Sequence, residues 1–110
     1  MGPKDAGDGS GHLHLDVRRD GASYVVRLSG ELDIVDADRL HAALHAIGAA
    51  AVVADLSNLK FLDGAGLSAL VSARHRWQAE GHTFTVRGAE GMVRRVFEIT
   101  GQGELLDGAT

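Results

Sequence analysis

The sequence predicts an α/β protein with a single mixed β-sheet, which opens with an antiparallel hairpin and continues with parallel β-α-β units. Two observations lead to this class. Residues 13–29 hold two stretches in which apolar and polar side chains alternate, as in half-buried strands. From residue 36 onward, stretches with helical spacing alternate with short apolar stretches, which indicates parallel strands joined by right-handed crossovers. We expect about three main helices, in the order β-β-α-β-α-β-α-β.

The opening hairpin is predicted from the two-residue period of its side chains. In HLHLDVRR the apolar face consists of Leu13, Leu15 and Val17. In ASYVVRLSG, Val26 and Leu28 form the corresponding apolar face. The Asp20-Gly21 dipeptide between the two stretches suits a two-residue turn, so we expect them to pair antiparallel.

A first helix and a central strand should follow the hairpin. The helix is predicted to open near Asp36, a good N-cap residue, and to stop at Gly48, which suits the position after a helix. Its apolar stripe consists of Ala37, Leu40, Leu44 and Ile47. The next stretch, AAVVADLS at residues 50–57, is nearly all apolar, and this predicts a central strand that is covered on both faces.

Two more helices and a strand complete the pattern. The helix after Asp63 has an apolar stripe of Leu67, Leu70, Val71 and Trp77. In HTFTVRG the alternation runs through Phe84 and Val86 and predicts a strand. The final helix, in AEGMVRRVFEIT, should bury Val93, Val96 and Phe97. It is expected to stop at Gly101, and a short last strand is expected in GELL, residues 103–106.

Length, charge and composition limit the domain organisation and the classes of function. A chain of 110 residues forms one domain, which we place at residues 12–107 after a disordered polar tail at residues 1–11. The net charge of -4 argues against binding nucleic acid, and the absence of cysteine excludes disulfides and thiolate chemistry. No apolar run is long enough to span a bilayer, and the N-terminus lacks a secretory signal, so we expect a cytoplasmic protein.

Two loops are the expected location of a binding site. In open sheets of this kind, sites collect beyond the carboxyl ends of the parallel strands. The sequence predicts such loops at residues 30–36, GELDIVD, and at residues 58–66, which lead into the second helix. We therefore expect the functional surface at this edge of the sheet.

Asp63 and two glycines define the start of the second helix. Asp63 is expected to cap the helix by accepting a hydrogen bond from the amide of Ala65 or Gly66. Gly64 and Gly66 have no side chains to shield the first amides, so this helix start is suited to an anion or a partner's backbone. The alternative is that the glycines let the helix pack close to a neighbouring loop.

Three stretches of the chain resemble the STAS domain, the module of anti-sigma factor antagonists. They are GELD, VVADLSNLKFLDGAGLSAL and AEGMVRRVFEITG, and the resemblance covers essentially residues 13–106. Its most specific part is Asp-Leu-Ser followed by Phe-x-Asp-x-x-Gly-Leu, between Asp55 and Leu67. The resemblance implies a non-enzymatic protein-binding module without a cofactor or metal. The implied partner-binding residues are Asp33, Asp63, Gly64, Ala65 and Gly66.

The chain departs from this family at the phosphoacceptor position. In the family, a serine directly after the loop aspartate is phosphorylated by a serine-kinase anti-sigma factor, which dissociates the antagonist. Asp63 matches that aspartate, but the acceptor position is Gly64 and the next residue is Ala65, so neither has a hydroxyl. The resemblance therefore implies a module that is not switched at the usual place. Ser68, one helical turn past Gly64, and Ser57 are substitute candidates, although a structural role is favoured for both.

The resemblance implies that the protein sequesters an anti-sigma factor with a histidine-kinase-like ATPase domain and so releases a sigma factor. No direct binding of nucleic acid, no membrane insertion and at most a weak homodimer are expected. Two alternatives stay open. Some STAS proteins of this size are subunits of lipid-transporting ABC complexes, and a pseudo-antagonist adaptor would occupy a kinase without being modified. The GELD and D-x-x-G-L features occur in antagonists and in transporter subunits, so they do not separate these functions.

Other polar residues carry weaker signals. His41 and His45 are four residues apart on the first predicted helix, so both rings can reach one metal ion, but no third ligand is evident. Two solvent-facing histidines are therefore the favoured interpretation. The chain also contains the residue types of a hydrolase triad, namely Ser57, Asp55 and either His75 or His82. There is no G-x-S-x-G elbow, so an enzyme is not expected.

Overall fold

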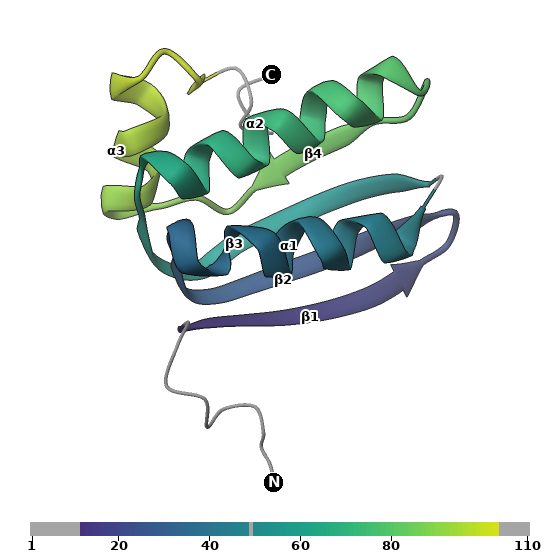
Figure 1. Cartoon of the computed structure of the whole chain (residues 1–110), viewed down its shortest axis with the longest axis horizontal. Helices are drawn as coiled ribbons and strands as arrows, with labels where there is room; N and C mark the ends of the chain where they lie inside the picture. Colours follow the sequence, from purple (N-terminus) through teal and green to yellow (C-terminus); the bar gives the residue numbers. More distant parts are fainter. Residues whose placement is uncertain (1–11, 49, 104–110) are drawn as a thin grey trace, which may run out of the picture.

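The computed structural model describes residues 12–48 and 50–103, in which helices pack on a mixed β-sheet (Figure 1). The elements are β1 (Leu13–Asp20), β2 (Ser23–Leu32), α1 (Ile34–Ile47), β3 (Ala51–Leu62), α2 (Gly64–Ala79), β4 (Phe84–Arg87) and α3 (Gly91–Ile99). The predicted fold class is confirmed. None of these helices is long and apolar enough to cross a membrane. The predicted tail at 1–11 and most of the predicted last strand, 104–106, lie outside the described residues.

The four strands lie in sequence order, so that β2 and β3 are central. β1 pairs antiparallel with β2, whereas β2 with β3 and β3 with β4 are parallel. Because both crossovers advance in the same direction across the sheet, α1 and α2 lie on the same face (Figure 1). The prediction that residues 50–57 are covered on both faces is therefore wrong. Val53, on the other face, is only half-buried.

The hairpin forms as predicted, but its turn is one residue later. Asp20 pairs with Ser23, so the turn consists of Gly21 and Ala22 rather than Asp20 and Gly21. Gly21 has φ +65, the positive value that the first central residue of a tight hairpin turn requires. Val17, predicted to face the core, is 42% exposed. β1 is an edge strand, and α1 packs against β2 and α2, which leaves the hairpin end of β1 uncovered.

The first helix begins earlier than predicted. Asp33 is its N-cap and helical residues start at Ile34, so Asp36 lies within the first turn. Asp36 is completely buried, and its carboxylate accepts hydrogen bonds from the His12 amide at 3.0 Å and from Arg39 at 3.1 Å, which offset the cost of burying it. Both aspartates suit an N-cap by residue type, but Asp36 instead joins α1 to the start of β1. The C-cap is Gly48, as predicted.

The two predicted loops are much shorter in the structure, because both strands extend further. β2 continues to Leu32 and β3 continues to Leu62, so most of residues 30–36 and 58–66 belong to strands and helices. β3 has two register shifts against β2, and these irregularities interrupt the alternation of its side chains. The sequence pattern therefore indicated a loop where the strand continues.

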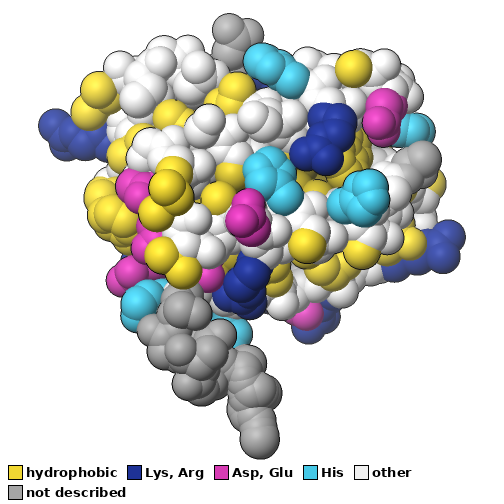
Figure 2. Space-filling view, in the orientation of Figure 1, with side chains coloured by type: hydrophobic (Ala, Val, Ile, Leu, Met, Phe, Trp, Pro, Cys, Tyr) yellow, Lys and Arg dark blue, Asp and Glu magenta, His cyan; other side chains and the backbone are white. Residues whose placement is uncertain are grey.

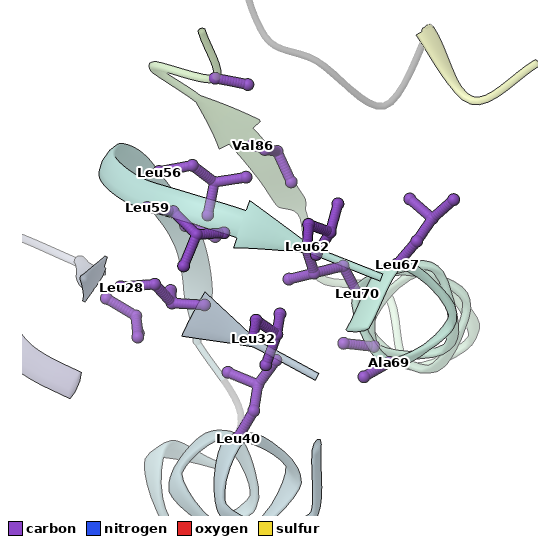
Figure 3. Close-up of a cluster of buried hydrophobic side chains, with 14 of the residues drawn as sticks. Leu28, Leu32, Leu40, Leu56, Leu59, Leu62, Leu67, Ala69, Leu70 and Val86 are labelled. Carbon is purple, nitrogen blue, oxygen red and sulfur yellow. The ribbon is translucent and has the colours of Figure 1, made fainter. Parts of the chain in front are cut away.

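The hydrophobic core lies between the sheet and the helices. In Figure 3, Leu40 of α1 points towards Leu32 of β2, and Leu70 of α2 points towards Leu62 of β3. Leu32, Leu40, Leu62 and Leu70 are at most 1% exposed. Burying one such side chain contributes about 1.5–3 kcal/mol. This packing fixes the N-terminal ends of α1 and α2 at the edge where β2 and β3 end.

Candidate functional site

The carboxyl ends of β2 and β3 lie side by side and bring the two predicted binding segments together. Leu32 pairs with Leu62 in the parallel ladder. The Asp63 amide then donates a hydrogen bond to the Leu32 carbonyl at 3.3 Å. Figure 1 shows α1 and α2 starting next to each other at this end of the sheet. The structure therefore places Asp33 and residues 63–66, predicted to bind a partner, on one edge, which we call the carboxyl edge.

Two aspartates cap the two helices at the carboxyl edge. Asp33 accepts a hydrogen bond from the Val35 amide at 3.0 Å. Asp63 accepts one from the Gly66 amide at 2.8 Å, which is one of the two donors that the sequence predicted. Both carboxylates sit next to the positive end of a helix, where a negative charge is stabilised. Their bonding fixes the start of each helix.

The two glycines after Asp63 have different structural roles. A Cβ on Gly66 would clash with the Leu32 carbonyl oxygen and lie 2.9 Å from both Leu32 Cγ and Leu62 Cδ1. A Cβ on Gly64 would meet no atom within 4 Å. Close packing, one of the two sequence interpretations, therefore explains Gly66, although the neighbours are the last residues of β2 and β3 rather than a loop. It does not explain Gly64, which is exposed at the surface.

The first amides of α2 are available to a partner. Among the described residues, the N–H groups of Gly64 and Ala65 donate to no acceptor, whereas that of Gly66 is taken by Asp63. Gly64 is exposed and Ala65 is half-buried. The first amides of a helix have no partner within the helix and carry its partial positive charge. These two amides can therefore receive a carbonyl or carboxylate oxygen.

Exposed apolar side chains surround the capping aspartates. Ile34 is 72% exposed, Val35 is 55% exposed, and Phe61 at the end of β3 is 37% exposed. Figure 2 shows hydrophobic and acidic side chains gathered at the left end of the molecule, where α1 begins. Ile34 and Val35 were not among the residues predicted to bind a partner. The sequence feature that could have indicated them is a pair of apolar residues directly after an aspartate that caps a helix, at positions that cannot reach the core.

The predicted substitute phosphosites lie in different surroundings. Ser68 is exposed on α2. Ser57 is part of β3, and its hydroxyl and amide both donate to the Asp55 carboxylate. Burial alone would raise the pKa of Asp55, but the Ser57 hydrogen bonds and the positive charges of Arg87 and Arg27 lower it below its ordinary value. Asp55 therefore has a structural role in its ionised form.

The residues considered for a hydrolase or a metal site are not brought together. The described partners of Asp55 are Ser57 and two arginines, and no histidine bonds to it. Nδ1 of His41 lies 3.4 Å from a guanidinium nitrogen of Arg76. Across residues 12–48 and 50–103, no three His, Cys, Asp or Glu side chains are grouped as metal ligands. These residues give no support to either kind of site.

Comparisons with known proteins agree with the fold and with the predicted resemblance. The family model described as "Mlab, STAS domain" matches residues 15–107. The solved structure of an anti-sigma factor antagonist from Mycobacterium paratuberculosis is 32% identical, with a TM-score of 0.76, over 86% of this chain and 82% of that chain. A comparison with curated protein sequences found no match.

Two more distant structures share the fold. The anti-sigma factor antagonist SpoIIAA in its unphosphorylated form is 21% identical, with a TM-score of 0.74, over 86% of each chain. A sulfate transporter family protein from Wolinella succinogenes is 18% identical, with a TM-score of 0.69, over 81% of this chain and 75% of that chain. From the family match and the similar antagonist structure, we conclude that the chain belongs to the STAS domain family.

Proposed function

We propose that the protein is an anti-sigma factor antagonist that binds an anti-sigma factor through the carboxyl edge. STAS domains are generally binding modules rather than enzymes, and the antagonist at 32% identity supports this class. The observation that carries the proposal is the exposed pair Ile34 and Val35, which directly follows the capping residue Asp33 on the edge that also holds Asp63. Exposed apolar side chains rimmed by charged ones are typical of protein interfaces.

The carboxyl edge offers a partner three kinds of contact. Ile34 and Val35 supply apolar area. The amides of Gly64 and Ala65 supply donors to a partner's oxygen atom. Beside them, Asp63 supplies a negative charge that attracts a basic partner and speeds association. The proposed partner is an anti-sigma factor with a histidine-kinase-like ATPase domain, which presents basic and apolar groups to this edge.

In this proposal, binding is not controlled by phosphorylation at the usual position. A phosphoserine would add a charge of about -1.5 to -2 beside Asp63 at the docking surface, which would oppose binding. Gly64 has no hydroxyl to modify. The exposed Ser68 lies one helical turn further along α2 and is the substitute site to be tested. The protein would then be constitutively competent, or controlled by its abundance or by a different partner.

Affinity capture of the tagged full chain from its host's lysate tests the docking edge. We expect the wild type to recover a histidine-kinase-like ATPase and Asp63→Lys to recover roughly tenfold less, since a tenfold loss needs only about 1.4 kcal/mol. Asp63→Asn keeps a capping side chain and removes the charge, so it separates electrostatics from helix stability. Glu80→Lys makes the same charge change at the exposed opposite end of α2 and should bind normally. Equal recovery by Asp63→Lys would refute the docking edge.

The regulatory part is tested with the captured kinase and ATP. Wild-type protein should gain no phosphate, whereas Gly64→Ser should gain one, because the position has room for a side chain. Intact-mass spectrometry measures both. A phosphate on Ser68 of the wild type would contradict the unswitched mechanism while leaving the docking edge intact.

A second function, as a STAS subunit of a lipid-transporting ABC complex, is favoured by one observation. The family model that matches the chain is named for Mlab rather than for an antagonist. Recovery of a membrane permease with its ATPase in the same capture experiment would support this function. Recovery of a kinase that binds but never modifies the chain, not even Gly64→Ser, would support a pseudo-antagonist adaptor.

A further inference from the structure

A row of four charged residues crosses the sheet on the face opposite α1 and α2. Asp16 of β1 pairs with Arg27 of β2, Arg27 pairs with Asp55 of β3, and Asp55 pairs with Arg87 of β4. From one edge of the sheet to the other, the charges therefore read negative, positive, negative, positive. The next row on this face begins with Arg18 of β1, whose Nε donates a hydrogen bond to the Asp16 carboxylate at 2.9 Å, and continues with the half-buried Val25, Val53 and Thr85.

The charged row is only partly satisfied within the molecule. The Asp55 side chain is 8% exposed, and its Oδ2 lies 3.9 Å from Arg27 Nε and 3.5 Å from an Arg87 guanidinium nitrogen. These distances are too long for good hydrogen bonds. Among the described residues, Arg18 donates to Asp16, whereas the guanidinium groups of Arg27 and Arg87 donate to no acceptor, and their side chains are 45% and 48% exposed. Both arginines therefore keep donors for a carboxylate from outside.

We propose that this face pairs with the same face of a second copy of the chain, around a twofold axis parallel to the strands. Such an axis reverses the order of the strands but does not move residues along the strand direction, so each row faces the same row of the second copy. The charged row therefore faces the second copy's charged row in the opposite strand order. Asp16 then lies opposite the second copy's Arg87, and Arg27 lies opposite its Asp55. An isologous interface requires this kind of self-complementarity.

The alternating charges also exclude the other simple orientation. A twofold axis along the row would place each charged residue opposite its own copy, Arg27 against Arg27 and Asp55 against Asp55, which is repulsive. Facing sheets lie about 10 Å apart and cross at about 30°. Across a row of four strands, that angle displaces the outer residues by only about 4 Å, which a long arginine side chain can span.

The size of the face predicts a weak dimer. β4 has four residues, so the shared area is about 19 Å wide and 13 Å long, or roughly 250 Å² per copy in projection. A stable interface buries about 800 Å² per partner. We therefore expect dimerisation only at high micromolar concentration or above. The carboxyl edge lies at the end of the sheet rather than on this face, so each dimer would present two docking edges.

Sedimentation velocity on the full chain tests the proposal with a charge swap. From about 10 to 500 μM protein in about 50 mM salt, the average mass of the wild type should rise towards that of a dimer, and about 500 mM salt should weaken this rise. Asp16→Arg or Arg87→Glu alone places like charges opposite each other and should weaken the dimer roughly tenfold or more. Combining the two should restore it, because the pair re-forms with reversed signs.

The swap separates contact between copies from effects within one chain. Within one chain, Arg87→Glu repels Asp55, and Asp16→Arg loses the bond from Arg18 and repels it. The two sites are three strands apart, so neither substitution corrects the effect of the other within one chain. If Arg87→Glu does not fold, Asp16→Arg on the edge strand still tests the contact. Arg94→Glu makes the same charge change on exposed α3 and should leave the dimer unchanged. A monomeric wild type at about 500 μM, a dimer insensitive to Asp16→Arg, or a failed rescue would each overturn the proposal.

Discussion

Replacing the two glycines after Asp63 separately should have opposite effects on stability. Gly66→Ala adds a Cβ that clashes with the Leu32 carbonyl oxygen and lies 2.9 Å from Leu62 Cδ1. Gly64→Ala adds a Cβ that meets nothing within 4 Å. The same chemical change, two residues apart in one helix, therefore tests whether close packing at Gly66 is required.

The magnitude follows from the contact distances. Carbon atoms in contact prefer about 3.5–4.0 Å, so the new methyl at Gly66 is at least about 0.6 Å too close to each leucine. Relief requires the end of β2 to move away from α2, although the Asp63 amide is bonded to Leu32 there. Overpacking of this kind costs about 1–3 kcal/mol, and the higher helix propensity of alanine returns up to about 1 kcal/mol. Because the clash includes a backbone oxygen, we take the upper cost of about 3 kcal/mol less about 1 kcal/mol, and expect Gly66→Ala to lose about 2 kcal/mol. Gly64→Ala should gain up to about 0.5 kcal/mol.

Urea unfolding of the wild type and both variants measures these differences. With an m-value of about 1.5 kcal/mol per molar urea, a loss of 2 kcal/mol moves the midpoint down by about 1.3 M, whereas Gly64→Ala should move it slightly up. The wild type is the reference, and an unchanged m-value shows that unfolding stays comparable. If Gly66→Ala were as stable as Gly64→Ala, the close approach of α2 to Leu32 would be wrong.

Two buried carboxylates give further predictions. The folded pKa of Asp55 is below its ordinary value of 3.8, so the stability from its ionised form is present above that value and is lost as pH falls through the folded pKa. The wild type should therefore be more stable than Asp55→Asn at pH 7. The difference between their urea midpoints should shrink below about pH 4. A difference that does not change with pH would contradict a stabilising role for the ionised carboxylate. Asp36→Ala removes the acceptor of the His12 amide and should lose about 1–3 kcal/mol in the same assay, and a loss below about 0.5 kcal/mol would show that the contact is unimportant.

The sequence predicted much of the fold because local patterns and tertiary structure agree. The alternating stretches around Val26 and Leu28 form strands, and the helix after Asp63 starts where its capping residue indicated. The start of α1 was misplaced because Asp33 and Asp36 both suit an N-cap. Burial and long-range bonding of Asp36 decide between them, and neither is visible in a local pattern.

The candidate site was predicted in part. Asp33 and Asp63 lie together at the carboxyl edge because β2 and β3 are adjacent and parallel, which the topology implied. The surface around Ile34 was missed, because exposure depends on where the other elements lie. The charged row through Arg27 was also missed, since it depends on the register of four strands, and β3 contains register shifts that periodicity does not reveal.

The open space at Gly64 has a consequence for how such a chain can evolve. Some glycine and serine codons differ by a single base, and a serine side chain at this position needs no repacking of the helix start. At Gly66 any side chain is opposed by Leu32, and selection for stability acts directly on that residue. If the proposed function holds, control by phosphorylation could be gained or lost at Gly64 while the packing of the scaffold stays unchanged.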